Sequence, residues 1–265
     1  MIQVTIGQYF PGKSVVHALD PRMKIILTLV YVAMLFTATN PFALLAGAAF
    51  LALVYILSRI PIKLILRSLK PILPIIIFTA VLNLFFVQGP PIFQFYFIKI
   101  TSAGLMTAFL MSLRIICLIA GTSLLTYTTS PILLTDAIER LLKPLKLLHA
   151  PVHELAMMMT IALRFIPTLI EETDKIMNAQ KARGADWENG SVMSRAKAMI
   201  PILIPLFVSA FRRADELALA MECRCYAGGE HRTRMRQLKL QSRDFMALLF
   251  IAAFFAGVIV LNVFA

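Results

Sequence analysis

Two stretches of eleven residues end in the same way and guide the interpretation of the whole chain. Residues Asp174–Gly184 read DKIMNAQKARG, and residues Asp215–Cys225 read DELALAMECRC. Aligned without a gap, both begin with Asp and have an aliphatic residue two positions later, then an Ala, then an Arg between two small residues. On a helix, each stretch presents an apolar strip leading to this Arg, because residues three and four apart share a face. The match predicts two similar helices, each with one Arg at its end.

Either stretch alone has a simpler interpretation, an amphipathic helix whose solvated terminal Arg suits the helix dipole. Their repetition in one chain favours a shared role instead. Small neighbours allow close docking of a helix end, and Arg is suited to a forked contact with a carboxylate. The candidate binding residues are therefore two triplets, Ala182-Arg183-Gly184 and Cys223-Arg224-Cys225.

The composition is that of a polytopic membrane protein. Hydrophobic residues make up 59% of the chain and the mean hydropathy is +0.81, far above an ordinary soluble domain. Through Thr129 there are nine Lys/Arg and a single acid, Asp20, whereas seventeen Lys/Arg and thirteen acids follow from Ser130 onward. The basic residues mostly flank apolar runs, so the positive-inside pattern explains the net charge of +12 better than a nucleic-acid partner does.

Five apolar runs are candidate membrane spans. They cover residues 25–39, 42–57, 72–87, 103–127 and 245–265. A helical span needs about 20 residues, so the shorter runs suit tilted or partly re-entrant helices. The basic stretch 59–70 is expected to lie amphipathically in the membrane interface, and the aromatic loop 88–101 is expected at an interface too. The predicted fold class is all-α, with about five transmembrane helices and a cytoplasmic helical domain of about three helices.

The segment 130–243 differs from the rest of the chain because it mixes charges with apolar residues. It contains a short amphipathic helix over 135–145 and two long helices, which start near Pro151 and Met199. Each long helix begins apolar, contains Pro167 or Pro201 and Pro205, and ends charged at its Arg. The predicted domains are a membrane domain at 1–129, the cytoplasmic helical domain at 130–243 and a C-terminal transmembrane helix at 244–265.

The Lys/Arg distribution predicts an orientation. A cytoplasmic N-terminus puts Lys13, Arg22, Lys24 and the basic cluster 59–70 inside, together with the segment 130–243, and leaves Lys99 alone outside. We therefore expect a multi-pass protein of the cell membrane with its N-terminus in the cytoplasm.

Motifs for catalysis are missing or incomplete. There is no Gly-rich phosphate loop, so the chain is not expected to hydrolyse nucleotide. His153-Glu154 begins like a zinc-protease helix, but Met157 stands where the second His is required. Cys223 and Cys225 near His231 lack a second pair of metal ligands. We expect no enzymatic activity, no metal site and no cofactor bound by this chain itself.

Two other classes of function are weighed against these features. A secondary transporter or channel should carry polar groups in several spans, and an intramembrane enzyme should carry paired acids or His there. The first four spans hold little beyond Arg114 and Asn83. Arg114 either lines a substrate path or caps carbonyls or pairs with an acid near the cytoplasmic surface, and the structural role is favoured because no intramembrane acid accompanies it.

Over essentially its whole length the chain resembles a known family, the transmembrane T component of energy-coupling factor transporters. The resemblance is carried by LDPRMK at 19–24, LRFIP at 163–167, KARGA at 181–185 and the second Arg motif. The family pattern Ala-Arg-Gly is matched at Ala182–Gly184. Cys223–Cys225 departs from it but keeps the Arg and the small flanks, which raises the question of whether the last residue needs the backbone freedom of glycine.

The resemblance implies that the two Arg-tipped helices are coupling helices. Each would insert into a groove on one of two cytoplasmic ABC-type ATPase subunits, which bind the ATP. The membrane part and the apolar halves of the helices would hold a separate substrate-binding membrane subunit, the S component, for uptake of vitamins or metal ions. The expected partners are these subunits and the lipid bilayer, and ATPase closure is expected to bring Arg183 and Arg224 together.

Overall fold

The computed structural model describes residues 9–87, 91–95, 98–144, 151–185, 191–228 and 238–264. These residues form two compact units. The bundle unit comprises Gly7–Ala137 and Arg236–Ala265, and the paired-helix unit comprises Ile138–Met235. The division between the units therefore falls inside a helix, α6 (Pro131–Leu142). The domain limits predicted from the sequence remain a prediction.

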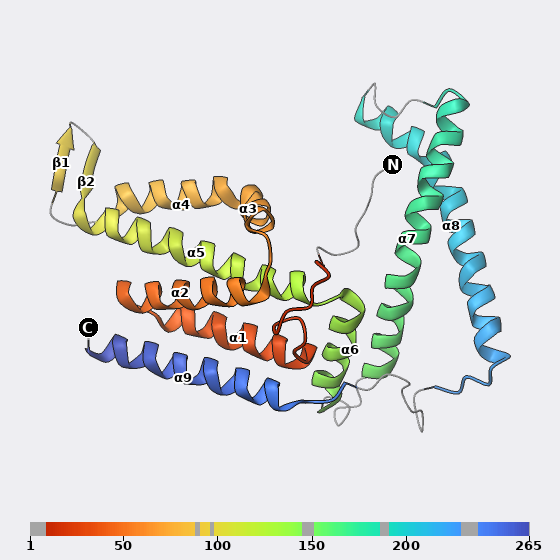
Figure 1. Ribbon diagram of the computed structural model, residues 1–265. Helices are drawn as coiled ribbons and strands as arrows, with labels where there is room; N and C mark the ends of the chain where they lie inside the picture. Colours follow the sequence, from red (N-terminus) through yellow and green to blue (C-terminus); the bar gives the residue numbers. More distant parts are fainter. Residues whose placement is uncertain are drawn as a thin grey trace. The chain divides into compact units, whose positions relative to one another are not determined.

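Five helices of the bundle unit lie side by side (Figure 1). They are α1 (Pro21–Thr37), α2 (Pro41–Ser58), α4 (Leu73–Phe86), α5 (Ser102–Thr128) and α9 (Ser242–Phe264). Each corresponds to one of the five apolar runs. The basic connection forms the amphipathic helix α3 (Ile62–Leu69), followed by a 3-10 turn at Lys70–Ile72. The prediction of an all-α polytopic membrane protein is confirmed.

The helix boundaries follow from local chemistry. The Asp20 side chain accepts a hydrogen bond from the backbone N–H of Arg22 at 2.9 Å, and Pro21 occupies the first position of α1. This is the predicted N-cap arrangement, because the first turn of a helix has unpaired donors and proline has none to satisfy. At α5, the Thr101 hydroxyl accepts from the backbone N–H of Gly104 at 3.0 Å in the same way.

The segment predicted to be an aromatic loop contains an antiparallel strand pair, β1 (Pro91–Phe95) and β2 (Ile98–Thr101). Phe95 lies opposite Ile98, and Gln94 lies opposite Lys99. Aromatic and β-branched residues are concentrated here, and these residue types favour strands. The loop prediction considered only the affinity of these aromatics for the membrane interface and missed this strand signal.

The core of the bundle unit combines apolar packing with internal hydrogen bonds. Met34, Leu35 and Leu44 are almost fully buried. Gly121 lets α5 approach α1 closely, because a Cβ at this position would lie 2.5 Å from the ring of Tyr31. The Tyr55 hydroxyl donates to the Ala120 carbonyl at 2.8 Å, so its polar atom is satisfied inside an apolar environment.

Helix α9 is hydrogen-bonded at each of its ends to residues at or next to the ends of α1. Near its N-terminus, Asp244 Oδ1 accepts from the backbone N–H of Asp20 at 2.8 Å. Near its C-terminus, the Asn262 side chain donates to the Thr37 carbonyl at 2.6 Å and accepts from the Thr39 N–H at 3.2 Å. The 18 residues between Asp244 and Asn262 span about 27 Å, close to the thickness of a hydrocarbon core.

Six helical stretches in the described part of the chain are long and apolar enough to cross a membrane, judged by length and composition. They are Pro41–Ser58, Ile62–Phe86, Ser102–Thr128, Val152–Ala182, Val192–Glu222 and Ser242–Phe264. Helix α1 is outside this set because it has 17 residues. Hydrogen bonds nevertheless join Asp20 to Asp244 and Thr39 to Asn262, so the apolar parts of α1 and α9 between these bonds span the same thickness.

The paired-helix unit is dominated by α7 (Val152–Ala182) and α8 (Val192–Glu222), each of 31 residues (Figure 1). Pro167 lies inside α7, and Pro201 and Pro205 lie inside α8, yet both helices continue through these positions. Helix α7 runs from the predicted start after Pro151 to the predicted Arg end, whereas α8 begins at Val192, seven residues before the predicted start near Met199.

Candidate functional site

The six candidate residues lie at two helix ends, and all of them are exposed. Ala182 is the last residue of α7, followed by Arg183 at the C-cap and then Gly184. Helix α8 ends at Glu222, followed by Cys223, Arg224 and Cys225.

The end of α7 is a Schellman motif, the arrangement in which two backbone N–H groups beyond the helix return to carbonyls of its last turn. The N–H of Gly184 donates to the Lys181 carbonyl at 3.0 Å, and the N–H of Ala185 donates to the Gln180 carbonyl at 3.0 Å. Gly184 has φ +86°, in the left-handed region that this motif requires. Glycine adopts that conformation without a steric penalty from a Cβ.

The end of α8 has the same hydrogen-bond pattern in the same register. The N–H of Cys225 donates to the Glu222 carbonyl at 2.8 Å, and the N–H of Tyr226 donates to the Met221 carbonyl at 3.0 Å. Cys225 has φ +54°, so a cysteine here adopts the left-handed conformation that Gly184 adopts in the first motif. The departure from the Ala-Arg-Gly pattern therefore changes the residue but not the geometry of the helix end.

The shared geometry gives both arginines the same position, one residue before the left-handed residue that terminates the helix. Neither the Arg183 nor the Arg224 guanidinium has a hydrogen bond or ion pair within the described residues. The carbonyl end of a helix carries partial negative charge, which favours a cation there. Each helix thus presents an exposed guanidinium on a well-defined support and leaves it available to a carboxylate from outside the chain.

The two helices of the unit are antiparallel, and polar contacts join them where they cross. Arg213 donates to Glu172 at 2.9 Å, and the Ser209 hydroxyl donates to the same carboxylate. Further toward the end of α7, Gln180 Nε2 donates to the Pro201 carbonyl at 3.4 Å. As residue numbers rise along α7, those of their partners on α8 fall.

This arrangement places the two Arg ends at opposite ends of the helix pair. Gln180 lies beside Pro201, and Arg224 follows 23 residues later, which corresponds to about 35 Å of helix. Arg183 and Arg224 are therefore not neighbours in this structure. The expectation that ATPase closure brings the two Arg ends together concerns an assembled complex and stays a prediction.

The Gln180 contact has a specific chemical cause. Pro205 has no N–H, so the carbonyl of Pro201, four residues earlier, loses its normal donor within the helix. The Gln180 amide of α7 fills this place. The proline thereby creates an acceptor on α8 that a side chain from the end of the neighbouring helix uses.

The weaker sequence signals have structural explanations. The Arg114 guanidinium donates to the Ala38 carbonyl, which follows the last residue of α1, so Arg114 caps carbonyls as the structural interpretation predicted. The cap lies at the end of α1 away from Asp20, however, and not at the end expected to face the cytoplasm. His153 Nδ1 lies 3.2 Å from Glu139 Oε1 and forms an ion pair with it when protonated. Among the described residues no three His, Cys, Asp or Glu side chains gather as metal ligands. His231 lies outside those residues.

A charged cluster near the start of α1 was not foreseen from the sequence. Arg22 binds both oxygens of Asp20, through Nε at 3.1 Å and a terminal nitrogen at 2.9 Å, while Asp244 binds the Asp20 backbone. The Lys24 ammonium donates to the carbonyls of Thr128 at 2.9 Å and His17 at 3.2 Å. The stretch LDPRMK indicated a helix start, but its partners are distant in the sequence and could not be paired by inspection.

These features define a class of protein: a multi-pass helical membrane subunit with two exposed Arg-capped helices. The chain matches the family described as cobalt transport protein, CbiQ, over residues 12–235. It is 55% identical over 249 residues to the energy-coupling factor transporter transmembrane protein EcfT of Thermosediminibacter oceani, covering 94% of each chain. The EcfT proteins of Clostridium kluyveri and Bacillus subtilis are 54% and 51% identical, and each match covers 92% or more of both chains.

The chain belongs to the EcfT family of energy-coupling factor transporter transmembrane proteins. Its predicted role, the transmembrane coupling subunit of such a transporter, is confirmed by this membership. The family resemblance stated from the Arg motifs is confirmed with it.

Proposed function

We propose that Arg183 and Arg224 are the two points at which this subunit docks onto two cytoplasmic ABC-type ATPase subunits. The observation that supports this most directly is the repeated helix end, in which the two triplets adopt the same Schellman geometry around an exposed Arg. Two equivalent cationic ends on one chain match two ATPase subunits that each offer a carboxylate in a groove. A forked contact between guanidinium and carboxylate supplies both strength and orientation.

In this proposal one set of chains hydrolyses ATP and another chain couples this hydrolysis to transport. The ATPases bind and hydrolyse ATP, and this subunit is non-catalytic and holds no cofactor of its own. A separate substrate-binding S component, which recognises a vitamin or a metal ion, packs against exposed apolar side chains of the membrane part and of α7 and α8. Met158, Met159 and Val208 are exposed residues of this kind. Clusters of exposed apolar side chains are typical of surfaces that contact a membrane or another protein.

We further propose that the N-terminus lies in the cytoplasm and that the protein resides in the cell membrane. The two ends of the bundle unit differ in charge, which supports this orientation. Arg22 and Lys24 lie with Asp20 and Asp244 at one end, whereas the end around Asn40 and Asn262 receives one cationic side chain, that of Arg114 at the Ala38 carbonyl. Basic residues favour the cytoplasmic side, so the end with Arg22 and Lys24 faces the ATPases.

The docking proposal is tested by reversing the charge of each Arg and measuring which subunits co-purify. Arg183→Glu and Arg224→Glu should each reduce recovery of ATPase subunits with the affinity-tagged membrane chain, and the double variant should nearly abolish it. Lys at either position should restore recovery only in part, because an ammonium cannot make the forked contact. Loss of one such charge-assisted contact corresponds to about 2–5 kcal/mol, or at least tenfold weaker binding.

A matched control is Arg212→Glu, since Arg212 is also an exposed Arg of α8 but lies outside the motif. This variant should express, insert and recover ATPases like the parent chain. Normal recovery of ATPases and normal uptake by the double Glu variant would disprove docking through the two Arg ends.

A further inference from the structure

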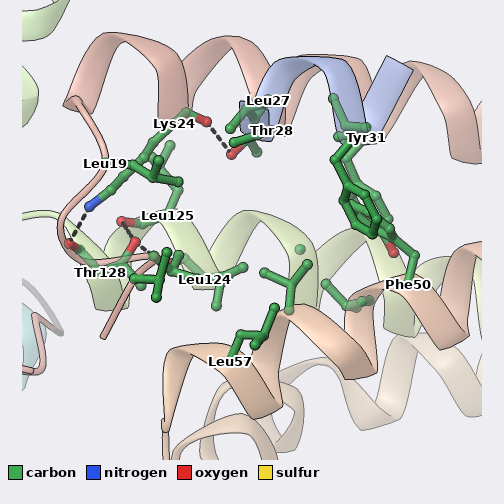
Figure 2. A pocket seen from close by; sticks show the side chains of 18 of the residues that line it. Leu19, Lys24, Leu27, Thr28, Tyr31, Phe50, Leu57, Leu124, Leu125 and Thr128 are labelled. Carbon is green, nitrogen blue, oxygen red and sulfur yellow. Dashed lines mark hydrogen bonds between the residues drawn. The ribbon is translucent and has the colours of Figure 1, made fainter. Parts of the chain in front are cut away.

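The bundle unit contains a cavity that takes no part in the proposed docking at the two Arg ends. Its volume is about 360 Å³, and its walls come from α1, α2, α5, α9 and the turn before α1 (Figure 2). Tyr31, Leu51 and Ile251 form buried parts of the wall, at 4%, 7% and 3% exposure. Other lining side chains, Leu57 and Met246 among them, are more than half exposed, so the cavity communicates with the outer surface of the bundle.

The cavity has a charged end and an apolar body. Figure 2 shows Lys24 and Thr128 grouped away from Tyr31 and Phe50, with leucines between them. Along α9 the lining residues run from Arg243 to Ile251, eight residues or about 12 Å of helix. Both lining cations, Lys24 and Arg243, lie in the first turns of α1 and α9 at the charged end.

The charges at this end leave a positive excess. Among the residues that the structure describes, three cations, Arg22, Lys24 and Arg243, lie near two carboxylates, Asp20 and Asp244. Asp20 is bound by Arg22, and Asp244 accepts from the backbone N–H groups of Asp20 and Gln241. An anion at the cavity mouth would therefore meet uncompensated positive charge.

The two lining cations retain hydrogen-bonding capacity. Lys24 is 5% exposed, and its ammonium gives two of its three donors to carbonyls. No carboxylate of the residues that the structure describes lies at ion-pair distance from this ammonium. Arg243 is exposed and has no ion pair within the described residues. A buried ammonium without a carboxylate partner is unusual for a folded protein.

We propose that this cavity binds one anionic phospholipid, with an acyl chain along the helices and the phosphate at Lys24 and Arg243. An amphiphile fits because the cavity is charged at one end and apolar along the bilayer direction. The lipid phase is what surrounds an exposed cavity mouth on a membrane bundle, and basic pockets between spanning helices on the cytoplasmic side bind anionic headgroups. The assignment of this end to the cytoplasmic side rests on the proposed orientation.

Native mass spectrometry of the full-length chain tests the proposal. Delipidated protein receives equal amounts of dioleoyl phosphatidylglycerol and dioleoyl phosphatidylcholine in mixed micelles, and the retained lipids are compared. One phosphatidylglycerol should be retained at least about fivefold more than phosphatidylcholine, and Arg243→Gln should lower that ratio about fivefold, the effect expected of one basic residue near a membrane surface. Arg67→Gln, which removes an exposed Arg of α3, should leave the ratio unchanged.

A second variant tests the acyl-chain position. Ala247 lines the cavity, and Ala253 is an exposed alanine of the same helix outside it. Ala247→Phe fills the cavity and should reduce retention of both lipids, whereas Ala253→Phe should not. Equal retention of the two lipids by the parent chain, equal effects of Arg243→Gln and Arg67→Gln, or undiminished retention by Ala247→Phe would each overturn the proposal. The assay contains no ATPase, so its result is independent of the docking proposal.

Discussion

At the scale of single residues, Cys225 shows how a motif can keep its geometry while changing its chemistry. Gly184 and Cys225 occupy the same left-handed position after their arginines, with φ +86° and +54°. The conformation costs a residue with a Cβ about 1–2 kcal/mol more than it costs glycine. The α8 end therefore retains its shape despite strain that the α7 end avoids.

Removing the Cβ at position 225 and adding a Cβ at position 184 should change the stability of the two helix ends in opposite directions. Cys225→Gly should stabilise the end of α8, and Gly184→Ala should destabilise the end of α7, each by about 1 kcal/mol. Gly184→Ala measures the cost of the left-handed backbone alone, because a Cβ at Gly184 meets no atom within 4 Å. Hydrogen exchange at the Ala185 and Tyr226 amides reports each end directly. Faster exchange at Tyr226 in Cys225→Gly would show that the cysteine side chain itself stabilises the cap.

The alignment of the two stretches predicted which residues are equivalent, but it could not predict the backbone conformation of Cys225. Cysteine has no general preference for the left-handed region, so residue type carried no signal there. The conformation follows from the two hydrogen bonds that close the helix end. The equivalence became visible only when the backbone of both ends was compared.

At the scale of elements, the contact between Gln180 and Pro201 links the end of α7 to an interior position of α8. Gln180 also belongs to the Schellman motif beside Arg183, because its carbonyl accepts from Ala185. A displacement at the first Arg end is therefore connected to the place where Pro205 interrupts the hydrogen bonding of α8. The sequence indicated both prolines and the Gln but not the register that brings them together.

A double-mutant cycle measures this link. Gln180→Leu should destabilise the parent chain by about 0.5–1 kcal/mol, the usual contribution of one neutral hydrogen bond. Pro205→Ala restores an N–H for the Pro201 carbonyl, so in that background Gln180→Leu should cost nothing through this contact. The free energy of unfolding of the four chains gives the coupling. Asn178→Leu, at an exposed position two residues earlier on the opposite face of α7, is the control and should show no coupling with Pro205→Ala.

Equal costs of Gln180→Leu in the two backgrounds would mean that the amide contributes nothing through the Pro201 carbonyl.

Of the helices themselves, the sequence predicted a great deal. The runs 42–57 and 103–127 differ from α2 and α5 by one residue at each end. Apolar runs bounded by Asn-Pro or Thr-Ser carry a strong local signal. The strand pair β1–β2 was missed because its short alternating segment was interpreted by membrane affinity instead of backbone propensity.

At the scale of the whole chain, the native cysteines can report the orientation. Cys223 and Cys225 are exposed and Cys117 is buried, so an impermeant maleimide reads the position of the second Arg end. With the N-terminus in the cytoplasm, the parent chain should remain unlabelled in intact cells and be labelled in inverted vesicles. Asn40→Cys in a background without native cysteines should be labelled from outside. Labelling of Cys223 or Cys225 in intact cells would reverse the proposed orientation.

The separation of the two Arg ends is a further consequence of the antiparallel pair. Spin labels replacing Ala182 and Cys223 should report a distance above about 30 Å in the isolated chain, because the helix between Pro201 and Cys223 is itself about 33 Å long. A distance below 20 Å by pulsed electron resonance, on the order of half the expected length, would contradict the antiparallel register. The sequence could not predict this arrangement, since the periodicity of each helix is the same in either direction.

The bond between the Asp20 backbone and Asp244 joins positions 224 residues apart, and this bears on how the protein is made. A ribosome adds about 5–20 residues per second, so roughly ten to forty seconds separate the two halves of this contact. Both long Arg-capped helices are synthesised in that interval. A nascent chain therefore cannot complete its membrane bundle until both Arg-capped helices have been synthesised. Chains terminated before residue 242 lack α9, so the surfaces of α1 and α2 that pack on it stay uncovered in the membrane.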